Sequence, residues 1–191
     1  VSDRVNALAL SPDNTLLAIG TGRLTHEGKL IVRSTDEWGV YDPLPAVSFP
    51  REVTSVAFSH DGQWLAAGGG MGWTGVWSVE TGEALALGPT DSENGLFFHA
   101  QADDTVSGLT FAPSNNANLV STTRNGRILL WSMEELGLSS WQQVDRFIND
   151  MTYSTELERL AFTTSDGAVL EVHVNDLAIS PTTLPGRQTD E

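Results

Sequence analysis

The stretch VTSVAFSHDGQWLAAGG, residues 53–69, contains two short apolar runs joined by a turn. We expect Val53, Val56 and Phe58 to lie on one face of an extended segment, because side chains alternate between the two faces of a strand. Asp61-Gly62 is typical of a two-residue hairpin turn, since glycine adopts positive φ without steric cost. The stretch therefore predicts one β-hairpin and by itself indicates no function.

The same pattern occurs four times along the chain. VNALALSPDNTLLAIG, VSGLTFAPSNNANLVSTT and the weaker INDMTYSTELERLAFTT align with the opening stretch. Each hairpin is followed by a second apolar unit (GKLIVRS, GWTGVWS, GRILLWS, GAVLEVH) and then by a further short segment. We therefore expect four strands per copy. The copies fill a single segment, residues 1–191, with repeats at approximately 5–49, 53–88, 106–147 and 148–180.

Composition limits the class of protein. The 191 residues are 40% hydrophobic, include 18 glycines and carry a formal net charge of −15, which suits an all-β chain with many turns. So acidic a surface disfavours nucleic acid and anionic membranes as partners. The absence of cysteine excludes disulfides, thiol nucleophiles and thiolate zinc sites. The sequence shows no signal-peptide pattern and no long apolar run, so we expect a soluble, cytoplasmic protein.

The repeated motif resembles the WD-repeat (WD40-like) β-propeller family over about residues 5–178. The match is clearest in the second and third repeats, where Trp77 and Trp131 each lie five residues after the turn glycine. The first and fourth repeats have Arg33 and Val172 at that position. The resemblance implies an all-β fold of about four blades, each of four antiparallel strands. Such sheets bury their apolar faces by stacking around an axis. The structural repeat positions of the family fall in this sequence at Trp77, Trp131, Asp61, Gly62, Asp166 and Gly167.

The sequence departs from the family at its hydrogen-bond network. Serine (Ser78, Ser132) replaces the aspartate of the Trp-Asp dipeptide. The third repeat offers a partial network from His99, Ser121, Asn125 and Trp131. In the second repeat, Ala67 and Met71 occupy the serine and aspartate positions of the network. The fourth repeat keeps the aspartate (Asp166) but has Phe162 and Val172 at the serine and tryptophan positions. We expect packing to replace these networks.

Four repeats are fewer than WD-repeat propellers usually contain. An open stack would expose sheet faces and strand edges to water. We therefore interpret the chain as a fragment of a larger protein. The remaining blades are expected from the rest of the parent chain or from a second copy.

No motif in the sequence indicates catalysis, a cofactor or a metal. The cluster GGGMGWTG, residues 68–75, lacks the Gly-Lys-Ser/Thr ending of a phosphate loop and is interpreted as a flexible connection between strands. Asp13, Asp61 and Asp166 fall in separate turns, without the spacing of a calcium loop. The histidines (His26, His60, His99 and His173) are scattered over different repeats and do not predict a zinc site.

Loops on one face are the expected binding surface. The resemblance implies that loops before the innermost strand and loops between the second and third strands share a face. Three of these loops are elaborate here: residues 21–28, 68–75 and 88–105. Binding often lies on loops of a rigid scaffold, with aromatics and arginines as anchors. The candidates are Arg51, Met71, Trp73, Phe97, Phe98 and Arg124. Packing of Phe97 and Phe98 onto their own blade remains an open alternative.

These features predict a non-catalytic scaffold or sensor module that binds protein or peptide. The alternative is a propeller hydrolase or lyase with a site at the central channel. The innermost strands contain LALS, VAFS, LTFA and MTYS, which offer few carboxylates or histidines for that role. A lectin-like propeller would need aromatic–acid pairs in every blade, and these do not repeat.

Overall fold

The computed structural model describes most of the chain. The described residues are 3–24, 26–44, 46–85, 98–99, 104–112, 118–135, 137–154, 159–173 and 179–180. Regular structure in these ranges is entirely β-strand, in agreement with the all-β prediction. No helix long and apolar enough to span a membrane is found in this part of the chain.

The strands form four antiparallel sheets, one for each sequence repeat. Blade 1 is β1 (Val5–Leu10), β2 (Leu16–Thr21), β3 (Gly28–Ser34) and β4 (Val47–Phe49). Blade 2 is β5 (Val53–Phe58), β6 (Trp64–Gly69), β7 (Trp73–Ser78) and β8 (Ala84–Leu85), with β9 (Phe98–His99) also paired to β7. Blade 3 is β10 (Val106–Phe111), β11 (Asn118–Thr123), β12 (Arg127–Ser132) and β13 (Gly137–Gln143). Blade 4 is β14 (Ile148–Ser154), β15 (Arg159–Thr164), β16 (Val169–His173) and β17 (Ile179–Ser180).

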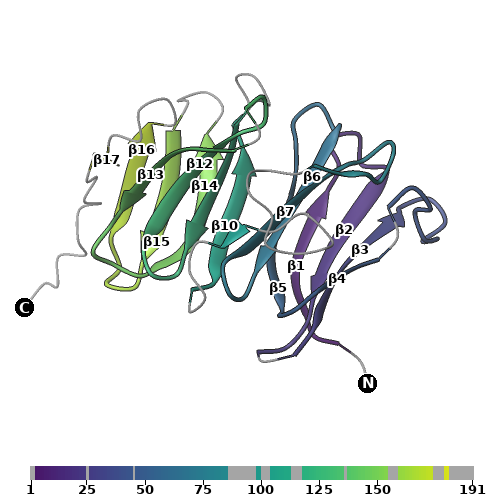
Figure 1. The fold of residues 1–191 in the computed structure, drawn as a ribbon, viewed down its shortest axis with the longest axis horizontal. Helices are drawn as coiled ribbons and strands as arrows, with labels where there is room; N and C mark the ends of the chain where they lie inside the picture. The colour runs from purple at the N-terminus through teal and green to yellow at the C-terminus, as the bar shows by residue number, and fades with distance from the viewer. Residues whose placement is uncertain are drawn as a thin grey trace, which may run out of the picture.

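The blades stand side by side, from blade 1 at the right of Figure 1 to blade 4 at the left. Their first strands β1, β5, β10 and β14 contact one another in that order, so they form the inner side of the stack. One apolar cluster fills each of the three junctions between neighbouring blades. Each sheet therefore buries an apolar face against its neighbour, as the propeller arrangement requires.

Close contacts at the junctions depend on small residues. A Cβ atom added to Gly68 of β6 would lie 2.8 Å from Cγ1 of Val106 in the next blade. The equivalent atom on Gly20 of β2 would lie 2.8 Å from Cγ1 of Val53. Both valines are fully or almost fully buried. Glycine in the second strand thus allows the first residue of the next inner strand to pack against it.

Every inner strand contains a β-bulge near its start. The register shifts between Val5 and Ala7 in β1 and between Val53 and Ser55 in β5, with equivalent shifts in β10 and β14. Because of the bulge, Val53 and Val56 join the same cluster although they are three residues apart. The prediction that Val53, Val56 and Phe58 share a face is confirmed, but regular alternation is not the cause.

Two turns differ from the sequence prediction. Asp61-Gly62 is not a two-residue hairpin loop: Phe58 pairs with Leu65, and the Gly62 amide donates to the Ser59 carbonyl at 3.0 Å. Of the two residues, only Gly62 has positive φ. Two successive residues with positive φ occur instead at Met71-Gly72, in the turn between β6 and β7, where φ is 63° and 68°. The rest of GGGMGWTG is mostly strand, in β6 and β7, rather than a flexible connection.

The hydrogen-bond network of the repeats is partial, as expected. In blade 3 the Trp131 indole nitrogen donates to the Ser121 hydroxyl at 2.8 Å. In blade 2 the equivalent Trp77 packs edge-on against Phe49 of blade 1, with ring centroids 5.9 Å apart. Phe162 and Val172 of blade 4 are buried in the junction with blade 3. Packing has replaced the network in blades 2 and 4.

Candidate functional site

A hollow of about 790 Å³ lies where the inner strands begin. We call it the hub hollow. Its wall contains residues from the start of all four inner strands and from two of the turns between second and third strands. The lining residues used below are Arg4, Asn6, Arg23, His26, Glu52, Thr54, Ser107, Arg124 and Asn149.

One backbone hydrogen bond recurs in all four blades and forms this face. The residue after the second strand donates its amide to the carbonyl just before the inner strand: Gly22 to Arg4 at 3.0 Å and Gly70 to Glu52 at 3.0 Å. The same bond joins Arg124 to Thr105 at 2.8 Å and Ser165 to Phe147 at 2.9 Å. The expectation that these two kinds of loop share a face is therefore confirmed.

The bulges supply a row of polar side chains to the hub hollow. The bulged residue is Asn6, Thr54, Ser107 or Asn149, and each of these lines the hollow. The Asn6 amide donates to the Val53 carbonyl at 3.2 Å, and the Thr54 hydroxyl donates to the Val106 carbonyl at 2.6 Å. These two bonds link neighbouring blades. A bulge redirects a side chain in this way because the extra residue leaves the regular pairing.

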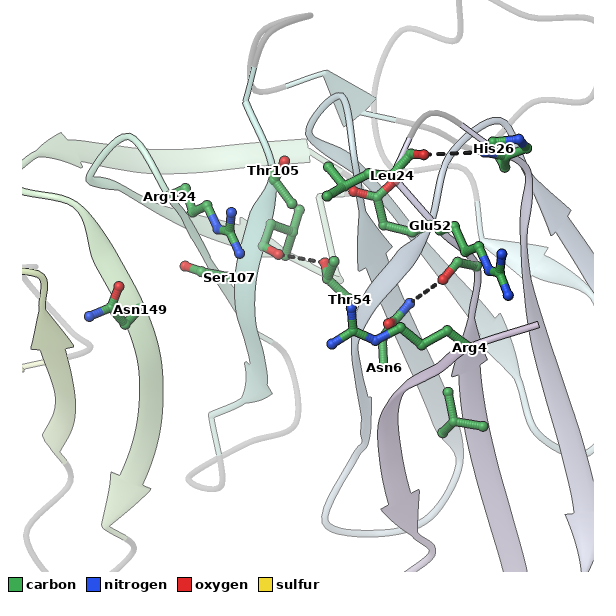
Figure 2. A pocket seen from close by; sticks show the side chains of 14 residues that line it. Arg4, Asn6, Leu24, His26, Glu52, Thr54, Thr105, Ser107, Arg124 and Asn149 are labelled. Carbon is green, nitrogen blue, oxygen red and sulfur yellow. Dashed lines mark hydrogen bonds between the residues drawn. The ribbon is translucent and has the colours of Figure 1, made fainter. Parts of the chain in front are cut away.

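Positive charge gathers around the hub hollow. Arg4, Arg23 and Arg124 have exposed side chains, and Figure 2 shows Arg4 and Arg124 on opposite sides of the view, with Thr54 between them and Ser107 beside Arg124. The ion pairs found among the described residues, Arg146–Asp166 and Arg159–Glu171, involve none of these three. Among the lining residues that the structure describes, the carboxylate is Glu52, which is 7% exposed.

Backbone bonds on both sides fix the position of Arg124. Its amide donates to Thr105 of its own blade, and its carbonyl accepts the Ile148 amide of blade 4 at 3.1 Å. The buried Asp104 carboxylate accepts the amides of Thr105 and Asn125, at 2.8 and 3.2 Å. The guanidinium therefore extends from a well-anchored turn.

The structure brings only part of the predicted binding set together. Arg124 lines the hub hollow, and Arg51 directly precedes the lining residue Glu52. Met71 occupies the tight β6–β7 turn, and Trp73 packs against the junction of blades 1 and 2. Phe98 lies in strand β9 rather than in an open loop, and Phe97 falls outside the described residues. Partner binding by these six residues remains a prediction.

Sequence reasoning missed most of the hollow, including Arg4, Arg23 and the bulged residues. One available signal was the spacing Val-x-x-Val at residues 53–56, which a regular strand cannot place on one face. That spacing, repeated in the other copies, marks the bulge and hence the polar residue that follows the first valine.

The turn aspartates are held by hydrogen bonds within their own turns. Asp13 accepts from the Ser11 hydroxyl at 2.6 Å and from the Thr15 amide and hydroxyl; these bonds, Ser11 first, lower the pKa of Asp13. Asp61 accepts from Ser59 at 2.6 Å. The Thr164 hydroxyl, with a smaller contribution from Arg146, lowers the pKa of Asp166. Turn formation thus accounts for all three, and the described residues contain no cluster of three or more possible metal ligands.

Comparison with known proteins agrees with this architecture. Residues 46–79 match the WD domain, G-beta repeat family. No curated protein matches the sequence. Among solved structures, the crystal structure of RRP9 WD40 repeats superposes with a TM-score of 0.73 at 18% identity, over 96% of this chain and 52% of that one. The structure of U3-55K gives a TM-score of 0.72 at 18% identity, over 94% of this chain and 52% of that one.

These findings define the class of protein. The chain has the fold of a β-propeller, and it spans about half the length of the solved structures it matches. The match to the WD repeat covers the last strand of blade 1 and the first three strands of blade 2, and the resemblance to WD-repeat propellers stated from the sequence is confirmed.

Proposed function

We propose that this protein is a non-catalytic interaction module that binds a protein or peptide at the face carrying the hub hollow. The observation that supports this most strongly is the recurring bulge, which turns a polar residue of every blade toward one hollow. A repeated polar lining on a rigid scaffold suits an extended ligand that crosses several blades. The WD-repeat resemblance agrees with this role, because such modules commonly serve as adaptors or assembly platforms.

The geometry gives less support to an enzyme. Among the lining residues, Glu52 and His26 are the side chains of the kind that usually act as acid or base. Glu52 is a single buried carboxylate, whereas glycoside hydrolysis, for example, needs two.

We propose also that blade 1 packs against a further blade of a larger propeller. Val5, Leu8 and Leu10 of β1 are 53%, 61% and 54% exposed, although the equivalent residues of blade 3 are buried. The superposition on half of a longer propeller chain agrees with this arrangement. The rest of a parent chain is the favoured source of that blade, and a second copy is the alternative.

The absence of cysteine allows a direct test of the binding face. A benzophenone maleimide is attached to Leu24→Cys in the lining of the hub hollow or to Gln63→Cys in the β5–β6 turn, at the opposite end of the strands. Both native residues are exposed, so neither substitution should disturb the fold. After irradiation in a native lysate, we expect Leu24→Cys to cross-link a defined protein that mass spectrometry identifies. Gln63→Cys should capture it weakly or not at all.

Equal capture from both positions, or capture only from Gln63→Cys, would contradict the proposed face. A second labelled variant, Asn149→Cys, lies on blade 4 within the same hollow. It should capture the same protein as Leu24→Cys if the ligand crosses several blades.

A further inference from the structure

We infer that the hub hollow selects an acidic peptide, that is, an extended segment with several Asp or Glu side chains. This inference rests on the proposed function and names the chemistry of the partner. It depends on three features: three arginines that form no ion pair with a described residue, the neutral polar side chains that line the hollow with them, and the contrast with the charge of the rest of the chain.

The arginines provide the charge that a carboxylate needs. Arg4 belongs to blade 1, Arg23 to the β2–β3 turn and Arg124 to the β11–β12 turn, so they surround the hollow instead of lying along one strand. A guanidinium binds a carboxylate through two parallel hydrogen bonds. Because none of the three forms an ion pair with another described residue, binding a carboxylate would break no ion pair seen here.

The bulged residues suit the backbone of a peptide. Thr54 and Ser107 are half-buried, and Asn149 is exposed on blade 4. In Figure 2, Thr54 lies between Arg4 and Arg124, and Ser107 lies beside Arg124. Hydroxyl and amide groups both donate and accept hydrogen bonds, so they can pair with peptide N–H and C=O groups. A peptide crossing the hollow would thus meet neutral partners for its backbone and cationic partners for its side chains.

The charge of the hollow is the reverse of that of the whole chain. The protein carries 25 acidic and 10 basic residues, whereas the charged residues in the described part of the lining are three arginines and Glu52. The acidic remainder of the surface repels a long polyanion such as nucleic acid. A short acidic peptide can place its carboxylates in the hollow while its ends stay clear of that surface.

Glu52 predicts a change in affinity opposite to that expected for the arginines. Its carboxylate is mostly buried, with one oxygen 3.1 Å from where a Cβ on Gly70 would lie, so it faces the β6–β7 turn. It remains a like charge for an acidic ligand. Removing that charge should strengthen binding, whereas removing an arginine should weaken it.

The test measures fluorescence anisotropy with a labelled peptide of alternating glutamate and glycine. Matched peptides replace glutamate by glutamine or by lysine. We expect the glutamate peptide to bind, and its affinity to fall about tenfold in Arg124→Gln and in Arg4→Gln. Glu52→Gln should bind about threefold more tightly. Lys29→Gln removes one positive charge from an exposed side chain of β3 that does not line the hollow, and it should leave the affinity unchanged.

Several results would overturn the inference. These are equal binding of the glutamine peptide, equal weakening by Lys29→Gln and Arg124→Gln, or tighter binding of a single-stranded RNA oligonucleotide than of the glutamate peptide. Thermal melting of each variant confirms that it is folded. If the cross-linker at residue 24 captures a partner while the glutamate peptide does not bind, the acidic-peptide inference fails and the proposed function stands. If the peptide binds but neither residue 24 nor residue 149 captures a protein, the hollow accepts acidic peptides while the proposal of a protein partner at this face fails.

Discussion

Strands β1 and β10 occupy the same place in their blades and differ in what covers them. Leu8 and Leu10 of β1 are 61% and 54% exposed, whereas their counterparts Leu109 and Phe111 of β10 are 7% and 2% exposed. The side chains are similar, so the difference comes from the neighbouring blade: β10 has blade 2 beside it. The burial of a blade face is therefore a property of the stack rather than of the single sheet.

The outer face of blade 4 differs from that of blade 1. Met151 and Tyr153 pack toward blade 3, so Asp150 and Thr152 lie on the opposite face by alternation. On that same face Arg159 forms an ion pair with Glu171 at 2.8 Å. One end of the stack is therefore apolar and the other polar. A polar outer face tolerates water, whereas an apolar one favours a partner.

A large loss of stability is expected from filling the space between two blades beside a glycine of the second strand. Gly68→Ala places a methyl group 2.8 Å from Val106 and 3.1 Å from Leu109, which forces neighbouring side chains to shift. We expect the free energy of unfolding to fall by about 1–3 kcal/mol, measured by urea denaturation. Gly39→Ala, where an added Cβ has no neighbour within 4 Å, is the control and should change it little. Equal effects of the two substitutions would contradict close packing of blades 2 and 3.

The second effect concerns association rather than folding. Leu10→Gln on the open face of blade 1 should change the free energy of unfolding by less than about 0.5 kcal/mol, because the side chain is already exposed. It should nevertheless reduce self-association measured by sedimentation velocity, since it interrupts the apolar face. Thr152→Gln, on the polar face of blade 4, should leave association unchanged. If both variants associate to the same extent, the apolar face of blade 1 does not drive association more strongly than the polar face of blade 4.

The smallest effect is the pH dependence of a turn. Because the Ser11 hydroxyl and Thr15 lower the pKa of Asp13 in the folded chain, the ionised carboxylate stabilises the fold. This stabilisation is complete above the ordinary carboxyl pKa and is lost as the pH falls through the lowered value. Carboxyl NMR titration should show the pKa of Asp13 moving up toward its ordinary value in Ser11→Ala. An unchanged titration in that variant would show that the Ser11 bond is not the main cause.

The fold was predictable from the sequence because hairpin signals and apolar periodicity recur in each copy. Trp77 and Trp131 indicated the third strands of blades 2 and 3 correctly. Ala67 and Met71 predicted that blade 2 lacks the hydrogen-bond network of the WD repeat. The hub hollow was harder to predict, because a bulge depends on cross-strand pairing and a hollow depends on residues far apart in sequence. Arg4 and Arg124 are 120 positions apart, and only the stacking of blades brings them to one face.

The most direct test of the stacked arrangement compares two leucines at the same repeat position. Leu109→Ala removes a side chain buried between blades 2 and 3, and Leu8→Ala removes its exposed counterpart on blade 1. Urea denaturation should show a loss of about 2–4 kcal/mol for Leu109→Ala and less than about 0.5 kcal/mol for Leu8→Ala. Equal losses in the two variants would mean that β1 and β10 are covered alike, and the blades would then not be stacked as described.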